Sequence, residues 1–148
     1  EILIIKRVNI LMKHELKNAY IYLNVLMKID ENQIIHGNVN VLVQVVNNMI
    51  SNAIQAYDGK HDQNIQLEIS KDSGNVIFSV TDFAGGLPKE VQDRLFKEMV
   101  TTKGKNGTGL GLYMSYSNIK AHFGGDITYK TEDGKGTTFN VIIPINRQ

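Results

Sequence analysis

Two pairs of short alternating segments constrain the fold of this chain more than any other feature of its sequence. Residues 65–70 and 76–81 alternate apolar with polar side chains on either side of a polar turn, and residues 126–131 and 137–144 do the same around a second turn. Alternation with a period of two predicts half-buried strands, and short Gly-containing turns predict that each pair forms a hairpin. Antiparallel hairpins disfavour a doubly wound parallel sheet.

Helical periodicity occupies most of the remaining chain, where apolar residues recur every three or four positions. Asn38 is a suitable N-cap for one such segment, and Gly124 with Gly125 is a suitable C-terminal cap for another. We therefore expect an α+β fold, a two-layer α/β sandwich whose mixed, mostly antiparallel sheet is covered on one face by helices. The predicted helices span residues 4–18, 38–57, 88–96 and 110–123, and one further alternating strand spans residues 19–25.

The size and charge of the chain limit what it can do. We expect its 148 residues to form a single domain, 1–148, with no internal linker. A net charge of +1 argues against general electrostatic binding to nucleic acid or to an anionic membrane. Cysteine is absent, which excludes disulfides and thiolate chemistry. The apolar run near the start is far shorter than the roughly 20 residues that cross a bilayer, and the start at Glu1 indicates a piece of a longer protein.

The helix predicted for residues 38–57 carries a row of side-chain amides. Gln44, Asn48, Asn52 and Gln55 recur at three- or four-residue spacing beside the apolar stripe. One interpretation is a solvated polar face. Exposed faces usually carry charged residues, however, and this segment contains no Lys, Arg, Asp or Glu. The alternative is a site for Mg²⁺ and phosphate oxygens, because an amide oxygen ligates Mg²⁺ without adding the charge of a carboxylate.

A second feature lies where the predicted strand 76–81 ends. Asp82 is followed by a turn that contains Gly85 and Gly86. An aspartate at such a position commonly caps the turn with its own side chain. The functional alternative is a carboxylate that accepts a hydrogen bond from an amino group such as that of adenine, beside glycines that let the backbone approach a flat ring.

A glycine-rich segment precedes the last predicted helix. Residues 99–109 are almost free of apolar side chains and predict a mobile surface loop, which ends in the alternating Gly107, Gly109 and Gly111. Backbone amides in such a segment can converge on an anion at a helix N-terminus, and Lys103 nearby favours a phosphate. The segment matches neither the P-loop nor the dinucleotide-binding fingerprint, and a flexible hinge is the structural alternative.

In this order, the three features resemble the catalytic and ATP-binding domain of sensor histidine kinases. This is a branch of the GHKL ATPases, which also include gyrase, the ninety-kilodalton heat-shock chaperone and mismatch-repair proteins. The resemblance covers nearly the whole chain and implies the Bergerat ATP-binding fold. Its motifs are an N box at residues 48–56, a first glycine box at 82–87, an F box at 95–103, a second glycine box at 107–112 and a Gly-Thr-Thr-Phe element at 136–139.

The resemblance implies roles for individual residues. Asn48 and Asn52 would hold Mg²⁺ and the triphosphate and, with Lys103, would form the catalytic set. Asp82 would bind the adenine amino group, and residues 97–109 would form a lid over ATP. The other cofactor-binding positions that it implies are Gly86, Phe96, Thr102, Gly107, Thr108, Gly109, Leu110 and Gly111.

His14 is followed by Glu15, a pair that is common at the phosphoacceptor of this family. The family places a helical hairpin between the acceptor and the N box, and the strand predicted at 19–25 leaves no room for one. We therefore interpret residues 1–18 as a leading helix and His14 as a surface residue, with the dimerisation domain absent. The implied function is a cytoplasmic protein histidine kinase that transfers the γ-phosphate of Mg–ATP to a histidine of a separate dimerisation domain, with a response regulator downstream.

Three other functions stay open from the sequence. A gyrase- or chaperone-type ATPase would carry a Glu general base where this chain has Asn48, and an amide cannot take a proton from water. An anti-sigma serine kinase shares the nucleotide fold, but residues 101–103 and 107–112 look more like those of the sensor kinases. A nucleotide-binding regulator without phosphate transfer is disfavoured by the intact Asn52 and Asp82.

Overall fold

The computed structural model describes residues 2–30, 33–86, 89–90, 93 and 107–145. Its helices are α1 (Ile2–Ala19), α2 (Val39–Ala56) and α4 (Gly107–Phe123). Its strands are β1 (Ile21–Met27), β2 (Gln63–Asp72), β3 (Asn75–Asp82), β4 (Asp126–Glu132) and β5 (Gly136–Pro144). None of the described helices is both long enough and apolar enough to cross a membrane.

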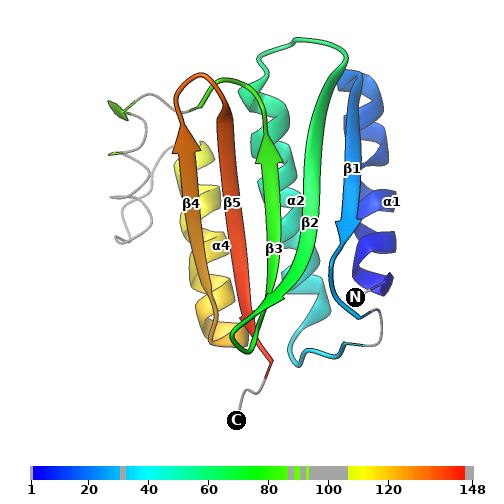
Figure 1. Ribbon diagram of the computed structural model, residues 1–148, viewed down its shortest axis with the longest axis vertical. Coiled ribbons are helices and arrows are strands. Elements are labelled where there is room, and N and C mark those ends of the chain that lie inside the picture. Colours follow the sequence, from blue (N-terminus) through cyan, green and yellow to red (C-terminus); the bar gives the residue numbers. More distant parts are fainter. Residues whose placement is uncertain (1, 31–32, 87–88, 91–92, 94–106, 146–148) are drawn as a thin grey trace.

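The strands form one five-stranded sheet in the order β1-β2-β3-β5-β4. β1 and β2 run parallel and are joined through α2, whereas all other neighbours pair antiparallel. The three helices lie side by side on one face of this sheet, with α2 between α1 and α4 (Figure 1). The predicted two-layer α+β architecture, with its two hairpins, is therefore correct.

The core lies between the helix layer and the covered face of the sheet. β3 and β5 alternate strictly between buried and half-buried side chains, so that every second residue points toward the helices. The apolar stripe of α2 fills the centre, where Val46, Met49 and Ile50 have no exposed surface. Each fully buried side chain of this size contributes on the order of 1.5–3 kcal/mol, so α2 is the element that holds the two layers together.

The caps of α2 follow the prediction. The side chain of Asn38 accepts hydrogen bonds from the N–H groups of Asn40, at 2.9 Å, and Val41, at 3.3 Å. These bonds satisfy donors that have no partner within the helix. At the other end Tyr57 is the C-cap, and left-handed Asp58 and Gly59 turn the chain toward β2.

The first strand begins two residues later than predicted. Tyr20 has a left-handed φ of 55°, and its N–H still bonds to the carbonyl of Lys17, so α1 runs through the start of the segment 19–25. The alternation itself is correct, because Ile21 is buried on the helix side. The error arises because the apolar–polar alternation of the sequence already begins at Ala19, before Tyr20, the residue at which the chain turns from α1 into β1.

The last helix begins earlier than predicted. α4 starts at Gly107, so residues 107–109 belong to the helix and not to the predicted loop 99–109. The predicted lid 97–109 stays a prediction, because most of it lies outside the described residues. Glycine is unfavourable in a helix by only about 1 kcal/mol, which packing of α4 against α2 offsets. Its C-terminal end is as predicted, because Gly124 is left-handed and its N–H bonds to Lys120.

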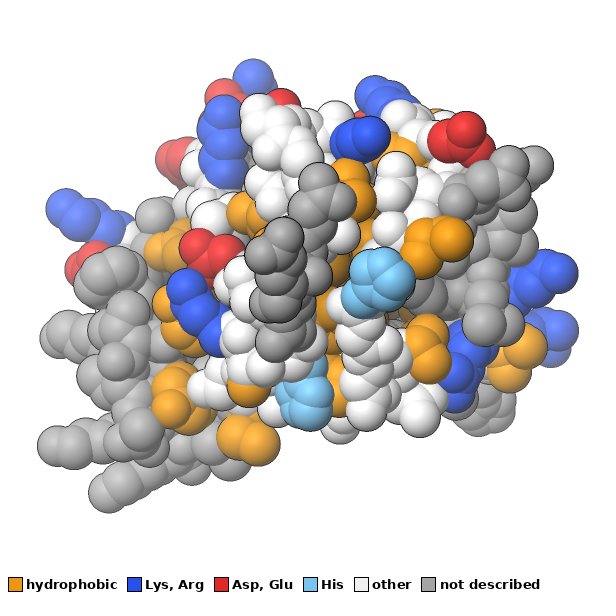
Figure 2. Space-filling model, turned by 90° about the horizontal axis from the view of Figure 1, so that it is seen from below, with side chains coloured by type: hydrophobic (Ala, Val, Ile, Leu, Met, Phe, Trp, Pro, Cys, Tyr) orange, Lys and Arg blue, Asp and Glu red, His pale blue; other side chains and the backbone are white. Residues whose placement is uncertain are grey.

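The remaining predicted elements fall mostly outside the described residues. Of the short helix 88–96, the structure describes only residues 89, 90 and 93, and these are helical. The part of the predicted loop before residue 107 is likewise outside the described residues. Figure 2 shows the end of the molecule that carries the β2–β3 turn, where Lys, Arg, Asp and Glu side chains lie mostly around the margin.

Candidate functional site

The amides of α2 divide between two environments. Asn48 and Asn52 are half-buried and lie one turn apart, whereas Gln44 and Gln55 are exposed. The Nδ2 of Asn48 donates a hydrogen bond to the Oγ of Ser115 in α4, at 3.1 Å. The predicted amide row therefore divides into two pairs. Gln44 and Gln55 are solvated, whereas Asn48 and Asn52 lie on the side of α2 that meets α4.

The contact between Asn48 and Ser115 also orients the amide. Ser115 is 1% exposed, so its hydroxyl is a fixed partner within the helix layer. Because the Nδ2 of Asn48 is directed at this hydroxyl, its Oδ1 is the atom that remains as a ligand. An amide held in this way offers an oxygen in a defined direction.

Asp82 lies at the end of β3, and its side chain points to the helix layer. It is only 5% exposed, an uncommon environment for a carboxylate. Its Oδ1 accepts a hydrogen bond from the N–H of Ala84 at 3.1 Å, so the turn-capping interpretation is correct. Burial raises the pKa of Asp82, and the backbone N–H groups of Ala84 and Thr137 oppose that rise. A carboxylate has about four lone-pair positions, so the cap leaves acceptor capacity for a ligand.

Tyr57 belongs to the same site, and the sequence analysis missed it. Its ring is 2% exposed, and its hydroxyl donates to the carbonyl of Asn64 and accepts from the N–H of Phe83 at 2.7 Å. Burial raises the pKa of Tyr57, and the nearby negative charge of Asp82 raises it further. The available signal was a tyrosine at a buried position of the helix stripe, because a buried hydroxyl requires partners.

The turn after Asp82 is clamped by the turn between β4 and β5. Gly85 and Gly86 have φ values of 104° and 91°, which favour glycine. A Cβ on Gly86 would lie 2.7 Å from the carbonyl oxygen of Glu132, whereas a Cβ on Gly85 would meet nothing within 4 Å. The carbonyl of Gly85 also accepts from the N–H of Gly134 at 2.9 Å. Gly86 thus has a packing role that is independent of any ligand.

The Gly-Thr-Thr-Phe element packs directly on Asp82. Gly136 approaches so closely that a Cβ would lie 2.0 Å from the carbonyl oxygen of Asp82. Thr137, its neighbour, is paired with Asp82 across the ladder between β3 and β5 and is 3% exposed. This contact explains why a glycine begins the last strand.

The glycine-rich segment contributes the first turns of α4. The backbone of Gly107, Gly109 and Gly111 is helical, as is that of Thr108 and Leu110 between them. The same helix carries Ser115, and through it contacts Asn48. The structure therefore brings the N box and the second glycine box onto neighbouring helices. The predicted site residues Phe96, Thr102 and Lys103 lie outside the described residues.

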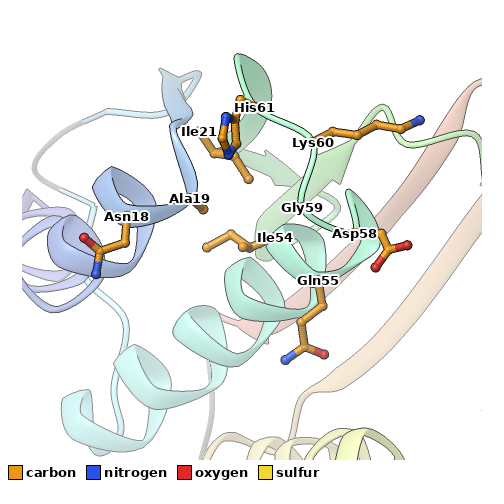
Figure 3. Close-up of a pocket in the computed structure, with 9 residues that line it drawn as sticks. All are labelled: Asn18, Ala19, Ile21, Ile54, Gln55, Asp58, Gly59, Lys60 and His61. Atoms are coloured by element: carbon orange, nitrogen blue, oxygen red, sulfur yellow. The ribbon is translucent and has the colours of Figure 1, made fainter.

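A cavity of about 500 Å³ lies at the opposite side of α2, between the ends of α1 and α2. Gln55, Asp58, Lys60 and His61 line it, but their polar ends point away from one another (Figure 3). Polar groups of a binding site converge on a ligand, and these do not. Across the described part of the chain, no three His, Cys, Asp or Glu side chains gather as a metal site.

Comparisons with known proteins agree with this geometry. Residues 37–147 match the family described as "Histidine kinase-, DNA gyrase B-, and HSP90-like ATPase". Sensor histidine kinase ZraS of Escherichia coli (strain K12) is 39% identical over 105 residues, which are 71% of this chain and 22% of ZraS. Sporulation kinase E of Bacillus subtilis (strain 168) is 37% identical over 121 residues, which are 80% of this chain and 16% of that protein. The chain thus spans about a fifth of the length of these relatives.

Solved structures show the same fold. The catalytic domain of histidine kinase ThkA aligns with a TM-score of 0.78 and 25% identity, covering 97% of this chain and 93% of that one. ThkA in complex with the response regulator TrrA aligns with a TM-score of 0.75 and 22% identity, covering 97% of this chain and 40% of that one. The resemblance inferred from the sequence motifs is therefore confirmed, and the chain belongs to the family of histidine kinase-, DNA gyrase B- and HSP90-like ATPases.

Proposed function

We propose that this chain is the ATP-binding catalytic domain of a sensor histidine kinase in two-component signal transduction. It binds Mg–ATP and transfers the γ-phosphate to a histidine on a separate dimerisation domain. The observation that carries the proposal is the buried Asp82 carboxylate at the end of β3, on the face of the sheet covered by the helix that bears Asn48 and Asn52.

The residues at this position fit the base of a nucleotide. The carboxylate of Asp82 is removed from water yet keeps acceptor capacity beyond its bond to Ala84. A buried acceptor favours a ligand that donates a hydrogen bond to it, as the adenine amino group does. Tyr57 holds the backbone just beyond Asp82 in place, which fixes the direction of the carboxylate.

The donor set on α2 fits a magnesium ion with phosphates. Asn48 and Asn52 offer amide oxygens, and the bond to Ser115 leaves the oxygen of Asn48 free to ligate. When bound, Mg–ATP supplies the phosphoryl group, and the metal neutralises charge on the phosphates. We assign phosphate contacts to the residues of the glycine-rich segment 107–111 and to Thr102 and Lys103, and contact with the nucleotide to Gly86 and Phe96.

The partners follow from the same assignment. ZraS and sporulation kinase E are named as kinases, and ThkA has been solved with a response regulator. We infer that this chain acts with a dimerisation domain of its own parent kinase and that a response regulator receives the phosphate. Because ATP and such a regulator are used inside the cell, we also propose that the domain acts in the cytoplasm.

An ATPase of the gyrase or chaperone kind is the principal alternative within the family. Such an enzyme needs a base to take a proton from water, and the side chain of Asn48 is an amide whose nitrogen donates to Ser115. An anti-sigma serine kinase or a regulator that binds nucleotide without transfer are the remaining alternatives. The experiment below separates all of these from a histidine kinase.

The test combines the purified chain with the dimerisation domain of its parent and γ-labelled ATP. We expect acid-labile, base-stable label on the dimerisation domain, which depends on Asn48 and is abolished by Asn48→Ala. The matched control is Asn75→Ala, which replaces an asparagine at the β2–β3 turn and should leave the label unchanged. Label on a serine, release of inorganic phosphate without label on the partner, or intact ATP with no label on the partner contradicts the proposal.

The chain alone provides a second test. Without the partner we expect tight binding of Mg–ATP or ADP, little turnover and negligible self-phosphorylation. The reason is that His14 lies within α1, a helix packed against α2 in the helix layer. Stoichiometric phosphohistidine at His14 after incubation with ATP contradicts this assignment.

A further inference from the structure

The edge strand β1 lacks the usual protection of a sheet edge. Natural edge strands carry charges, prolines or bulges that prevent pairing with another chain. β1 has the sequence Ile-Tyr-Leu-Asn-Val-Leu-Met, with no charged residue and no proline. Its register with β2 is continuous from Ile21 to Met27, without a bulge. Within the described residues, no strand pairs with its outer side.

The outer side of β1 presents unpaired backbone groups. The N–H of Lys28 donates to the carbonyl of Ile69 in β2, at 2.8 Å. In a parallel ladder the N–H and C=O of one residue point to the same neighbour, and successive residues alternate. Even-numbered residues of β1 therefore face β2, and the N–H and C=O groups of Leu23 and Val25 face the open edge.

Helix α1 forms a floor beside this edge. A groove of about 560 Å³ runs between α1 and β1, with Lys13 and Lys17 on one wall and Tyr20 and Tyr22 among its other lining residues. In Figure 1, α1 lies behind β1 at the outer margin of the sheet. A strand added to the edge would therefore lie over α1 and pack on it.

Exposed apolar side chains occur on both elements that form the groove, and two of them, Tyr20 and Tyr22, line it. Ile10 is 73% exposed and, by helical spacing, shares a face of α1 with Lys13 and Lys17. Of the eight large apolar side chains most exposed among the described residues, five lie on α1 or at β1. Apolar surface exposed at this edge of the sheet is of the kind that a partner covers. The five are Ile10, Tyr20, Tyr22, Leu26 and Met27.

We propose that β1 and α1 bind an extended, acidic segment of a partner protein, which adds to the sheet as a sixth strand beside β1. Backbone pairing with Leu23 and Val25 supplies the affinity, and the alternate side chains of the segment supply the specificity. Apolar side chains of the segment pack on the floor near Ile10, and its carboxylates pair with Lys13 and Lys17. A second copy of this chain is disfavoured as the occupant, because β1 has no Asp or Glu to offer these lysines.

The test uses the purified chain and a fluorescein-labelled peptide of alternating Val and Glu residues. We expect the anisotropy of the peptide to rise on addition of the chain. A peptide of the same sequence with N-methylated alternate amides cannot form the ladder and should not bind. Amide exchange by NMR gives the position: the N–H groups of Leu23 and Val25 should exchange rapidly in the free chain and slowly with peptide, whereas that of Asn24 is protected in both.

Paired charge reversals test the acidic character of the partner. The double variant Lys13→Glu with Lys17→Glu should bind the peptide roughly three- to tenfold more weakly, because two opposite-charge contacts become like-charge contacts. The matched control is Lys60→Glu with Lys71→Glu, two exposed lysines outside the groove, which has the same net charge and should bind as wild type. Replacement of the peptide's Glu by Lys should abolish binding to the wild-type chain.

Three results overturn the proposal. The first is absence of binding by the acidic peptide at low salt, and the second is equal binding of the N-methylated peptide. The third is a dimer of the free chain by sedimentation whose interface protects Leu23 and Val25, since the occupant would then be a second copy. None of these results bears on ATP binding, which is measured separately on the same sample.

Discussion

The hydroxyl of Tyr57 accepts a hydrogen bond from the backbone N–H of Phe83 at 2.7 Å and donates to the carbonyl of Asn64. Tyr57 follows α2, Asn64 lies in β2, and Phe83 comes directly after Asp82 at the end of β3. One side chain therefore joins the end of the helix with the two asparagines to the strand that ends in the carboxylate. This link sets the position of the proposed adenine-binding side of the site relative to its proposed phosphate-binding side.

The substitution Tyr57→Phe tests this link. The ring remains in the core, but the N–H of Phe83 and the carbonyl of Asn64 lose a buried partner. We expect a loss of about 1–3 kcal/mol in the free energy of unfolding by urea. We also expect severalfold weaker Mg–ATP binding by calorimetry, because the carboxylate next to Phe83 is less fixed. Tyr22→Phe, whose side chain is 60% exposed, is the control and should change neither quantity.

The substitution Asp82→Asn tests recognition of the base. An amide of the same shape keeps one acceptor but loses the charge, so the bond to an amino donor weakens. Hydrogen bonds to charged groups are worth about 1.5–3 kcal/mol, which corresponds to roughly ten- to hundredfold weaker ATP binding. Asp72→Asn, at the opposite end of the sheet, should bind ATP as wild type does. Unchanged affinity in Asp82→Asn contradicts the adenine role.

The same variant should change the dependence of stability on pH. Burial raises the pKa of Asp82 above its usual value of 3.8, so the native state holds a proton more tightly than the unfolded state. The contribution of this group to the free energy of unfolding is therefore largest below pH 3.8, falls as the pH rises to the raised pKa, and is constant above it. Asp82→Asn removes this contribution, so its stability relative to wild type should improve between acid and neutral pH in urea titrations. A constant difference across that range contradicts the raised pKa.

The fold was predictable because its signals are local. Strict alternation in β3 and β5 survives in the structure as strict alternation of burial. Asn38 caps α2 as predicted, since an N-cap depends only on its next few residues. The start of α4 was wrong for the opposite reason, because the helical state of Gly107 depends on packing against a distant helix that outweighs the low helix propensity of glycine.

The site was predictable only in part. Motif order identified the family and led to the prediction of Asn48, Asn52 and Asp82 as site residues, which stays a prediction. Sequence spacing could not distinguish Asn52, which is half-buried, from Gln55, which is exposed. The two residues are about one helical turn apart on the same side of α2, and their different burial depends on which other elements pack nearby. The sequence analysis did not find Tyr57, because its two partners, Asn64 and Phe83, are far apart in the sequence and come together only when β2 and β3 pair.

The substitution Ser115→Ala tests the orientation of Asn48. Loss of the 3.1 Å bond frees the amide to rotate, so its oxygen is held less well for the metal. One hydrogen bond of this kind is worth about 1 kcal/mol, which predicts roughly fivefold weaker binding of Mg–ATP and a smaller effect on ATP without metal. The control Ser117→Ala lies on the same helix and should bind Mg–ATP as wild type does. Equal affinities for the two variants contradict the positioning role.

A pair of glycine substitutions separates backbone strain from packing in the turn after Asp82. Gly85 and Gly86 both have positive φ, at 104° and 91°, so alanine is strained at either position. Only at Gly86 does the new Cβ also collide, at 2.7 Å from the carbonyl oxygen of Glu132. We therefore expect Gly86→Ala to lower the free energy of unfolding by about 1–3 kcal/mol more than Gly85→Ala does, because a backbone carbonyl in the β4–β5 turn must move. Urea unfolding of the two variants measures this difference directly. Equal destabilisation would mean that the carbonyl of Glu132 can move aside at no cost in free energy. Gly86 would then be required only because of its positive φ, and the packing role would be contradicted.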